Sequence, residues 1–322
     1  MPATPRPIPV ILDVDTGVDD ALAILFALAH PGITVLGISC VAGNAPLDRV
    51  VENTLRILDV AGVGDIPVAA GAHRPLIEPA RAASHVHGES GLGSLQLPPT
   101  ERRAVAQNSV ELMRELIEAS AEPVTLVALA PQTNLALLLR LYPGLAGNIE
   151  RIVFMGGSTS VGNATAVAEF NVWHDPEAAA IVLDSGVPTY MYGLDVFNRV
   201  AVDEITAEAL LTGESPLSRA VGALLTNRVL TGTDQQTEYS GLIGDAGAVC
   251  ALVDPGALTT HLLPLRVQLS GYGRGQTLVD LRRNPGEDIV HGLAEEWQSV
   301  EVALDVDVSR VTRLFLGTLG LA

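Results

Sequence analysis

The sequence predicts an α/β fold: a mostly parallel central sheet, Rossmann-like and open, with helices on both faces. Short runs rich in Val, Ile and Leu alternate with helical patterns along most of the chain, and this alternation is typical of a parallel sheet covered by helices. The chain has 322 residues, of which 48% are hydrophobic, enough for a large core. No low-complexity linker and no internal repeat divides it. We therefore expect one domain spanning residues 1–322.

The individual elements follow from apolar runs and from the residues that end helices. The first strand is a continuous apolar run that ends in aspartates, and the helix after it stops before Pro31. Gly62 and Pro143 end two later helices in the same way. In chain order, the predicted elements are strand 9–15, helix 19–31, strand 33–43, helix 47–62, strand 66–71, helix 108–123, strand 124–130, helix 133–144, strand 149–157, helix 175–186 and strand 188–196.

The rest of the chain is less regular. Segments 264–280 and 299–307 are predicted to hold a few late strands, and the segment from about 200 to 245 is helical and rich in loops. Open parallel sheets bind their ligands at the carboxyl ends of the strands. We therefore expect the functional site at that edge, with segment 200–245 as a lid over it.

The charge balance excludes several classes of partner. The chain carries 37 acidic residues against 19 basic ones, all of them Arg, for a net charge of −18. So few cations cannot neutralise a phosphate backbone, so nucleic acids are poor candidates for a partner. No G-x-x-x-x-G-K-[ST] loop is present to hold a phosphate chain. Small neutral substrates such as sugars or nucleosides meet no electrostatic penalty.

Membrane and secretory signals are also missing from the sequence. No uncharged apolar run reaches about 18 residues, so we expect no membrane span. The N-terminal residues lack the long apolar region of a secretory signal. Cys40 and Cys250 lie in apolar contexts, with neither a disulfide framework nor the spacing of a metal site. These observations predict a cytoplasmic protein.

Polar side chains follow the predicted strands where each strand ends. They are carboxylates and amides: Asp13, Asp15, Asp19, Asp20, Asn44, Thr133, Asn134, Asn163, Glu169, Asn171, Asp175 and, far along the chain, Asp245. Four aspartates within eight positions repel one another, and a bound cation removes that cost. Oxygen ligands of this kind select Ca²⁺ or Mg²⁺ over zinc. Asn, Asp and Glu also bind sugar hydroxyls, so the sequence predicts a metal site beside a polyol.

Two other metal motifs fail on spacing. An EF-hand loop starting at Asp13 would need Glu at its twelfth position, which is Ile24. A phosphatase-type D-x-D-x-[TV] motif would need Thr or Val where Gly17 stands. The tetrapeptide LDVD occurs at 12–15 and again at 304–307, so that string alone carries little information. The longer DVDTGVDDALAI is far more specific.

That longer segment resembles the signature of the nucleoside hydrolases, the inosine–uridine-preferring N-ribohydrolases. The similarity extends over nearly the whole chain in family order, through VAGN (41–44), HGESGLG (87–93), ALAPQTN (128–134), MGG (155–157), GNATAVAEFNVWHDPEAA (162–179) and GRGQTLVD (273–280). The resemblance implies hydrolysis of the N-glycosidic bond of ribonucleosides to base and ribose, within purine or pyrimidine salvage. It also implies a homodimer or homotetramer.

The resemblance assigns roles to individual residues. It implies a Ca²⁺ held by Asp15, Asp20, Asp245 and the backbone carbonyl of Thr133, with Asp15 taking the proton from a bound water. Asp245 also faces the substrate, since the cation holds the 2′- and 3′-hydroxyls of ribose. The remaining substrate contacts that it implies are Asp19, Asn44 and Asn171 on ribose hydroxyls, Asn163 and Glu169 on the 5′-hydroxyl, and Met155 against the sugar.

One position departs from the family. Many members that cleave purine nucleosides place a His just before the last calcium-binding Asp, where it protonates the leaving base. This chain has Gly244 there. His87, which matches a base-contacting His of some members, is the leading replacement as catalytic acid, with His85, Tyr239 and Glu238 as further candidates. The preferred base, ribose against deoxyribose, and dimer against tetramer stay open.

Other polar residues have structural explanations beside functional ones. Asp13 either supports the loop or contacts metal, and Asp175 before a proline is expected to cap a helix. Asp195 is a site support or a turn residue, and Trp173 and His174 line the site or pack in the core. Two alternative functions remain: a catalytically weak nucleoside- or polyol-binding relative, and a metal-dependent phosphatase or glycosyl-transfer enzyme.

Overall fold

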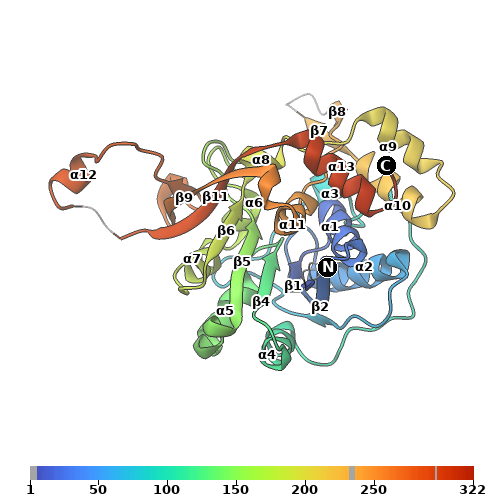
Figure 1. Ribbon diagram of the computed structural model, residues 1–322, viewed down its shortest axis with the longest axis horizontal. Coiled ribbons are helices and arrows are strands. Elements are labelled where there is room, and N and C mark those ends of the chain that lie inside the picture. The colour runs from blue at the N-terminus through green and yellow to red at the C-terminus, as the bar shows by residue number, and fades with distance from the viewer. Residues whose placement is uncertain (1–5, 232–235, 294–295) are drawn as a thin grey trace, which may run out of the picture.

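The computed structural model describes residues 6–231, 236–293 and 296–322, and is built around one nine-stranded sheet (Figure 1). The spatial order of its strands is β10-β9-β11-β6-β5-β4-β1-β2-β3. Its strands are β1 (Ile8–Val14), β2 (Ile33–Cys40), β3 (Val68–Ala70), β4 (Val124–Ala128), β5 (Ile149–Met155), β6 (Thr189–Tyr192), β9 (Leu258–Val267), β10 (Thr277–Val279) and β11 (Gln298–Val306). From β3 to β11 neighbouring strands run parallel, whereas β9 and β10 are antiparallel additions at one edge.

Helices cover both faces of the sheet, as the sequence predicts. One layer contains α1 (Val18–Ala29), α2 (Leu47–Ala61), α9 (Glu204–Leu211), α10 (Pro216–Leu225), α11 (Ala246–Val253) and α13 (Val308–Thr318). The other contains α4 (Ser109–Ala119), α5 (Thr133–Leu141) and α7 (Pro176–Leu183). Short helices occupy the connections: α3 (Ser84–His87), α6 (Phe170–His174), α8 (Leu194–Phe197), α12 (Glu287–Val290), and the 3-10 turns η1 (Pro143–Asn148), η2 (Pro255–Ala257) and η3 (Gly271–Gly273).

Two hydrophobic clusters lie on opposite faces of the sheet. In β1, Val10, Leu12 and Val14 pack into the cluster under α1, while Ile11 packs into the cluster under α4 and α5. This split follows from the strand period of two, which sends successive side chains to opposite faces. Because both faces are covered, β1 has no polar residue before Asp13. The fully buried strand therefore delivers its first aspartates directly at the sheet edge.

The strand order creates a crevice beside β1. Strands β2 and β3 lie on one side of β1, and β4, β5 and β6 on the other. The chain leaves β1 toward β2 and leaves β4 toward β5, so the loops after these two neighbouring strands run in opposite directions at their carboxyl ends. Such a switch point is where open α/β sheets bind ligands. The predicted fold class, a mostly parallel sheet with helices on both faces, is confirmed.

Two elements differ from the sequence prediction. Strand 188–196 ends early, at Tyr192, because the chain turns at Gly193 and continues as α8. There the Leu194 N–H donates to the Gly157 carbonyl instead of continuing the sheet (3.0 Å). Segment 200–245 contains the expected helices α9 and α10, and also a hairpin of β7 (Arg228–Thr231) and β8 (Gln236–Tyr239). Helix α10 packs in the same hydrophobic cluster as α1. The role of segment 200–245 as a lid stays a prediction.

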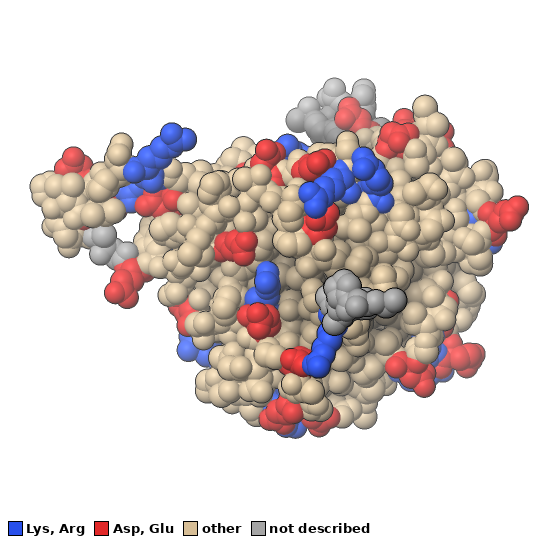
Figure 2. Space-filling view, in the orientation of Figure 1, with Lys and Arg blue, Asp and Glu red and all other residues tan. Residues whose placement is uncertain are grey.

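The outer surface shows two further features. The far ends of β9 and β11, with α12, extend away from the body as an arm (Figure 1). On the face shown in Figure 2, arginines lie near acidic groups. Surface ion pairs of the described residues include Arg310–Asp254 and Arg282–Asp280. Among the described residues no helix has both the length and the apolar character needed to cross a bilayer.

Candidate active site

The loop between β1 and α1 is held by its own aspartates. One carboxylate oxygen of Asp20 accepts the Asp15 N–H at 3.1 Å, and the other accepts the Gly17 N–H at 2.9 Å. These bonds satisfy backbone donors at the start of α1, where a negative charge is favoured. The chain therefore bends back within five residues, and Asp15 and Asp20 become neighbours with no exposed surface.

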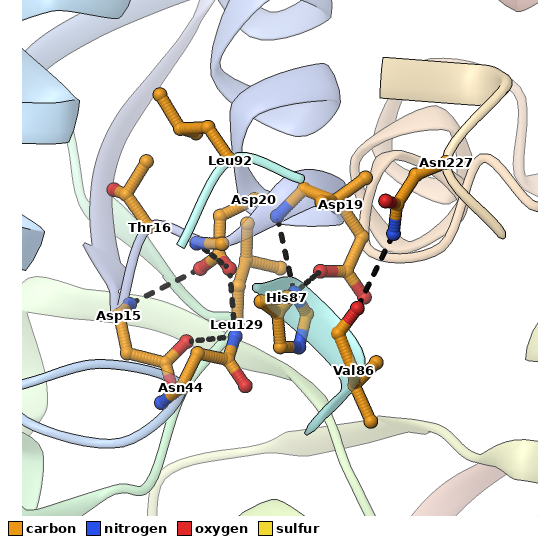
Figure 3. Close-up of polar contacts among 12 residues, drawn as sticks. Asp15, Thr16, Asp19, Asp20, Asn44, Val86, His87, Leu92, Leu129 and Asn227 are labelled. Carbon is orange, nitrogen blue, oxygen red and sulfur yellow. Dashed lines mark hydrogen bonds and ion pairs between the residues drawn. The ribbon is translucent and has the colours of Figure 1, made fainter. Parts of the chain in front are cut away.

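Asn44, after β2, joins these two carboxylates (Figure 3). Its backbone N–H donates to Asp15 Oδ2 at 2.7 Å, and its side-chain Nδ2 donates to Asp15 Oδ1 at 3.0 Å and to Asp20 Oδ2 at 3.1 Å. Both oxygens of Asp15 thus have a fixed orientation. Residues from the ends of two adjacent strands meet as predicted.

Three carboxylates come together in the acidic centre. Ligand oxygens of Asp19, Asp20 and Asp245 all lie within 4.8 Å of one another. Asp245 is buried at the start of α11, and Asp19 Oδ1 is buried without a hydrogen-bond partner among the described residues. Three oxygen donors so close fit a hard divalent cation such as Ca²⁺ or Mg²⁺. Asp15 lies beside this trio, with both of its oxygens engaged by Asn44.

The electrostatics of the centre show the cost of holding these groups together. Burial, reinforced by the charge of Asp19, raises the pKa of Asp20 to about 7. Burial also raises the pKa of Asp15, with Asp20 adding to it, and the pKa of Asp245, with Asp19 adding to it, well above the usual range. Each shift means that the cluster is short of positive charge. A divalent cation supplies that charge.

The opposite wall comes from the segment after β5. Glu169 caps α6: its carboxylate accepts N–H groups of Asn171 at 2.8 Å, Gly157 at 3.0 Å and Val172 at 3.2 Å. Burial raises the pKa of Glu169 to about 7 despite these bonds. Asn171 donates from Nδ2 to the carbonyls of Leu129 (3.0 Å) and Met155 (3.1 Å). Its Oδ1 is left free for a ligand hydroxyl.

Between these walls lies a cavity of about 440 Å³, within the range of small-molecule sites. Every substrate-binding residue predicted from the sequence lines it: Asp19, Asn44, Met155, Asn163, Glu169, Asn171 and Asp245. The predicted ligands Asp15 and Asp20 lie behind the lining, bonded to Asn44. The cavity also contains side chains that the sequence analysis did not select, Phe170 and Phe197, together with Arg81, whose guanidinium lies over the Trp173 ring.

Thr133 lies apart from this cavity. It is buried in the first turn of α5, and its hydroxyl donates to Asp175 Oδ2 at 2.6 Å. Leu129, in the same loop, lines the cavity, and its carbonyl accepts from Asn171 Nδ2. That the backbone carbonyl of Thr133 binds a metal stays a prediction.

His87 is the best placed of the candidate acids. It is buried at the end of α3, lines the cavity, and its Nδ1 accepts the Val18 N–H at 3.2 Å (Figure 3). A neutral ring that accepts at Nδ1 carries its proton on Nε2. Burial lowers the pKa of His87, so the neutral form is favoured. The ring is thus a hydrogen-bond donor at the cavity.

The other candidates separate by position. His85 is exposed but lines the cavity. Tyr239 donates its hydroxyl to the Val202 carbonyl at 2.7 Å, and neither it nor the exposed Glu238 lines the cavity. Of the four candidate acids, only His85 and His87 therefore line the cavity in which a leaving base could bind.

Three of the doubtful polar residues have structural partners. Asp175 accepts the Ala178 N–H at 3.1 Å, so the expected helix cap is present. Asp13 accepts bonds from Ser39 (2.5 Å) and Asn134 (2.9 Å), which tie β1, β2 and α5 together. Asp195 accepts the backbone and side-chain donors of Thr159 at 2.8 and 2.7 Å. It supports the loop that carries Asn163.

Gly244 occupies a position that excludes a side chain. Its φ is +54°, in the left-handed region, and a Cβ there would lie 2.4 Å from the Asp19 Cβ. Gly244→Ala should therefore lower the free energy of unfolding by at least about 1 kcal/mol, beyond the usual glycine effect. It should also lower kcat/KM, because Asp19 must move.

The control for this substitution is Gly144→Ala. Gly144 is exposed, and a Cβ there meets nothing within 4 Å. Denaturant unfolding and steady-state kinetics on both variants measure the effect. A Gly244→Ala protein as stable and as active as the Gly144→Ala protein would contradict the close approach to Asp19.

Comparison with known proteins decides the family. The sequence profile described as "Inosine-uridine preferring nucleoside hydrolase" matches residues 10–313. The chain belongs to the nucleoside hydrolase family. It is 42% identical to the pyrimidine-specific ribonucleoside hydrolase RihA of Citrobacter koseri over 275 residues, covering 85% of this chain and 88% of the relative. It is 41% identical to RihA of Escherichia coli over 275 residues, with the same coverage.

Solved structures agree with this assignment. A plant nucleoside hydrolase, PpNRh1, superposes with a TM-score of 0.86 at 30% identity, covering 98% of this chain and 99% of that one. A purine-preferring ribonucleoside hydrolase from Gardnerella vaginalis gives 0.85 at 29% identity, covering 97% and 98%. This nucleoside hydrolase is thus an enzyme of ribonucleoside hydrolysis. The family assignment favours that activity over a weak binding relative or a phosphatase.

Proposed function

We propose that this nucleoside hydrolase cleaves pyrimidine ribonucleosides to free base and ribose, with Ca²⁺ as its cofactor. The relatives at 41–42% identity are named pyrimidine-specific. The observation that carries the proposal is the trio of the half-buried Asp19 and the buried Asp20 and Asp245, whose oxygens lie within 4.8 Å of one another.

The cation would be held by Asp15, Asp20 and Asp245 together with a backbone carbonyl. That carbonyl would be the one of Thr133, whose side chain is held in place by its hydroxyl bond to Asp175. When bound, Ca²⁺ would lower the pKa of a water molecule and fix the 2′- and 3′-hydroxyls of ribose.

Asp15 would act as the general base. Two bonds from Asn44 hold its carboxylate in place and fix its orientation. The water oxygen bonds to C1′ as its proton passes to Asp15. The C1′–N bond breaks and its electron pair leaves with the base. The sugar gains oxocarbenium character, which the surrounding carboxylates stabilise.

The lining residues would position the ribose. Asp19, Asn44 and Asn171 would bind its hydroxyls, Asn163 and Glu169 the 5′-hydroxyl, and Met155 would contact the sugar. Asn171 supports this assignment because its Nδ2 is already used by the Leu129 and Met155 carbonyls, which orients its Oδ1. Glu169 retains an acceptor for a hydroxyl because three backbone donors leave part of its capacity unused.

Stabilisation of the leaving base falls to His87. Gly244 has no side chain, and a Cβ added at this position would clash with Asp19. The Nε2–H of neutral His87 would donate to a base oxygen or nitrogen as negative charge develops there. This arrangement requires no acid at position 244.

The substrate class is tested with a panel of uridine, cytidine, inosine, adenosine and guanosine. We expect kcat/KM at least about tenfold higher for a pyrimidine than for any purine, a difference of about 1.4 kcal/mol. Free base and free ribose are quantified by chromatography. A purine that is cleaved fastest would contradict the pyrimidine assignment and leave the hydrolase activity standing.

Three wider features belong to the same proposal. The enzyme would act in a reducing cytoplasm, consistent with two free, buried cysteines, Cys40 and Cys250. It would assemble as a homodimer or homotetramer. Segment 200–245 would serve as a lid: Leu224, Asn227 and Leu242 of this segment line a small cavity together with Asp19 and His87.

A further inference from the structure

The hydroxyl of Thr277 links the edge of the sheet to the active-site wall. Thr277 starts β10 and is 4% exposed. Its Oγ1 accepts the Ser158 N–H at 2.9 Å and donates to the Ser158 carbonyl at 2.7 Å. One side chain thus satisfies both backbone groups of one residue, 119 positions away. Among the described residues, the Ser158 N–H and carbonyl have no other hydrogen-bond partner, so this pair of bonds, the Ser158 clamp, fixes the backbone there.

The residue before Ser158 contacts Glu169 directly. The Gly157 N–H donates to Glu169 Oε2 at 3.0 Å. Gly157 has φ of +72°, and a Cβ there would lie 2.7 Å from Thr277 Cγ2. Glycine at this position lets the backbone lie against Thr277 while its N–H points at the carboxylate. Thr277 and Glu169 therefore hold adjacent residues of one short segment.

The hydrogen bond from the Gly157 N–H differs from the other two that the Glu169 carboxylate accepts. The other two donors, Asn171 and Val172, belong to α6, the helix that Glu169 itself caps. They move with the carboxylate. The Gly157 N–H comes from outside the helix, so it alone ties the carboxylate to the end of β5. Gly157 is held by the Ser158 clamp on one side and by the Leu194 N–H, which donates to the Gly157 carbonyl, on the other.

The neighbours of Thr277 support the same wall. Gly275 packs closely on the Trp173 backbone of α6, and Arg274 forms a bidentate ion pair with Glu177 of α7 (2.6 and 2.8 Å). Segment 273–280 was selected in the sequence as a motif without an assigned task. In the structure it is a brace across α6, α7 and the loop after β5.

We propose that Thr277 is a positioning residue for the 5′-hydroxyl of ribose, acting through Ser158, Gly157 and Glu169. The inference rests on the proposed function in one respect, the contact between Glu169 and the 5′-hydroxyl. Thr277 is not among the residues that line the cavity, so it would act through Glu169, and its effect would be confined to substrates that carry that hydroxyl.

The test compares Thr277→Val with Thr277→Ser on two substrates, uridine and 5′-deoxyuridine. Valine keeps the shape and removes the hydroxyl, whereas serine keeps the hydroxyl. For Thr277→Val we expect kcat/KM on uridine to fall about tenfold, the scale of one lost hydrogen bond, and kcat/KM on 5′-deoxyuridine to change less than about threefold. Thr277→Ser should remain within about threefold of wild type on both.

Each other outcome has a defined meaning. Equal losses on both substrates in Thr277→Val would overturn the inference, since a general loss of structure acts on every substrate. Equal losses in Thr277→Ser and Thr277→Val would overturn it too, because the hydroxyl would not matter. If the wild-type enzyme hydrolyses uridine but does not distinguish it from 5′-deoxyuridine, the Glu169 contact is wrong. If it hydrolyses neither, the proposed function itself fails.

Discussion

Asp15→Asn should lower kcat on the best nucleoside substrate at least about 100-fold, the scale of losing a general base. The amide has nearly the same shape as the carboxylate but cannot accept a proton from water. Both Asp15 oxygens accept from Asn44 donors, so one of these donors loses its acceptor in the variant. Thermal unfolding is therefore measured beside kcat, and the loss attributed to the base is the one seen in protein that is folded. It is measured at saturating Ca²⁺ and substrate.

The matched control is Asp65→Asn, since Asp65 is exposed in the loop after α2. Like Asp15→Asn, it removes one negative charge from the protein. We expect it to leave kcat unchanged within about twofold. A near-normal kcat for Asp15→Asn, with Asp65→Asn also normal, would show that Asp15 is not the base.

Asp245→Asn should weaken Ca²⁺ binding about 100-fold, since affinity depends strongly on the charge and number of oxygen ligands. Asp245 is buried beside Asp19 and Asp20, and its burial and their charge raise its pKa. Removing this buried carboxylate relieves repulsion, so the metal-free variant should be at least as stable as metal-free wild type. Loss of binding would thus not come from unfolding.

Titration calorimetry with Ca²⁺ measures the affinity, and thermal unfolding without metal measures the stability. Asp65→Asn again serves as control and should bind Ca²⁺ as the wild type does. Unchanged affinity in Asp245→Asn would remove Asp245 from the ligand set. A variant that is markedly less stable without metal would contradict the repulsion argument.

The sheet was accessible from sequence because its strands are buried on both faces. Runs such as Val10–Leu12 have no polar interruption, so β1, β4 and β5 stand out from the helices between them. The short elements carry no such signal. Helix α3 has four residues, and the turn into α8 at Gly193 follows from a tertiary hydrogen bond to Gly157.

The residues of the site show the same contrast between what the sequence identifies and what only the fold identifies. Side chains that perform chemistry, such as Asp15, Asn44 and Glu169, carry their function in their residue type and could be selected from the sequence. The Ser158 clamp made by Thr277 could not, because it depends on a partner 119 residues away. It became visible only when the chain was folded.

The most direct test of the central claim is the hydrolysis of uridine by the purified protein, before and after removal of Ca²⁺ by a chelator and after Ca²⁺ is restored. We predict release of uracil and ribose in equal amounts with Ca²⁺, loss of both after chelation, and recovery when Ca²⁺ is added back. Release that continues at the same rate after complete removal of the metal would contradict the account of Asp15, Asp20 and Asp245 as the ligands of a required cation.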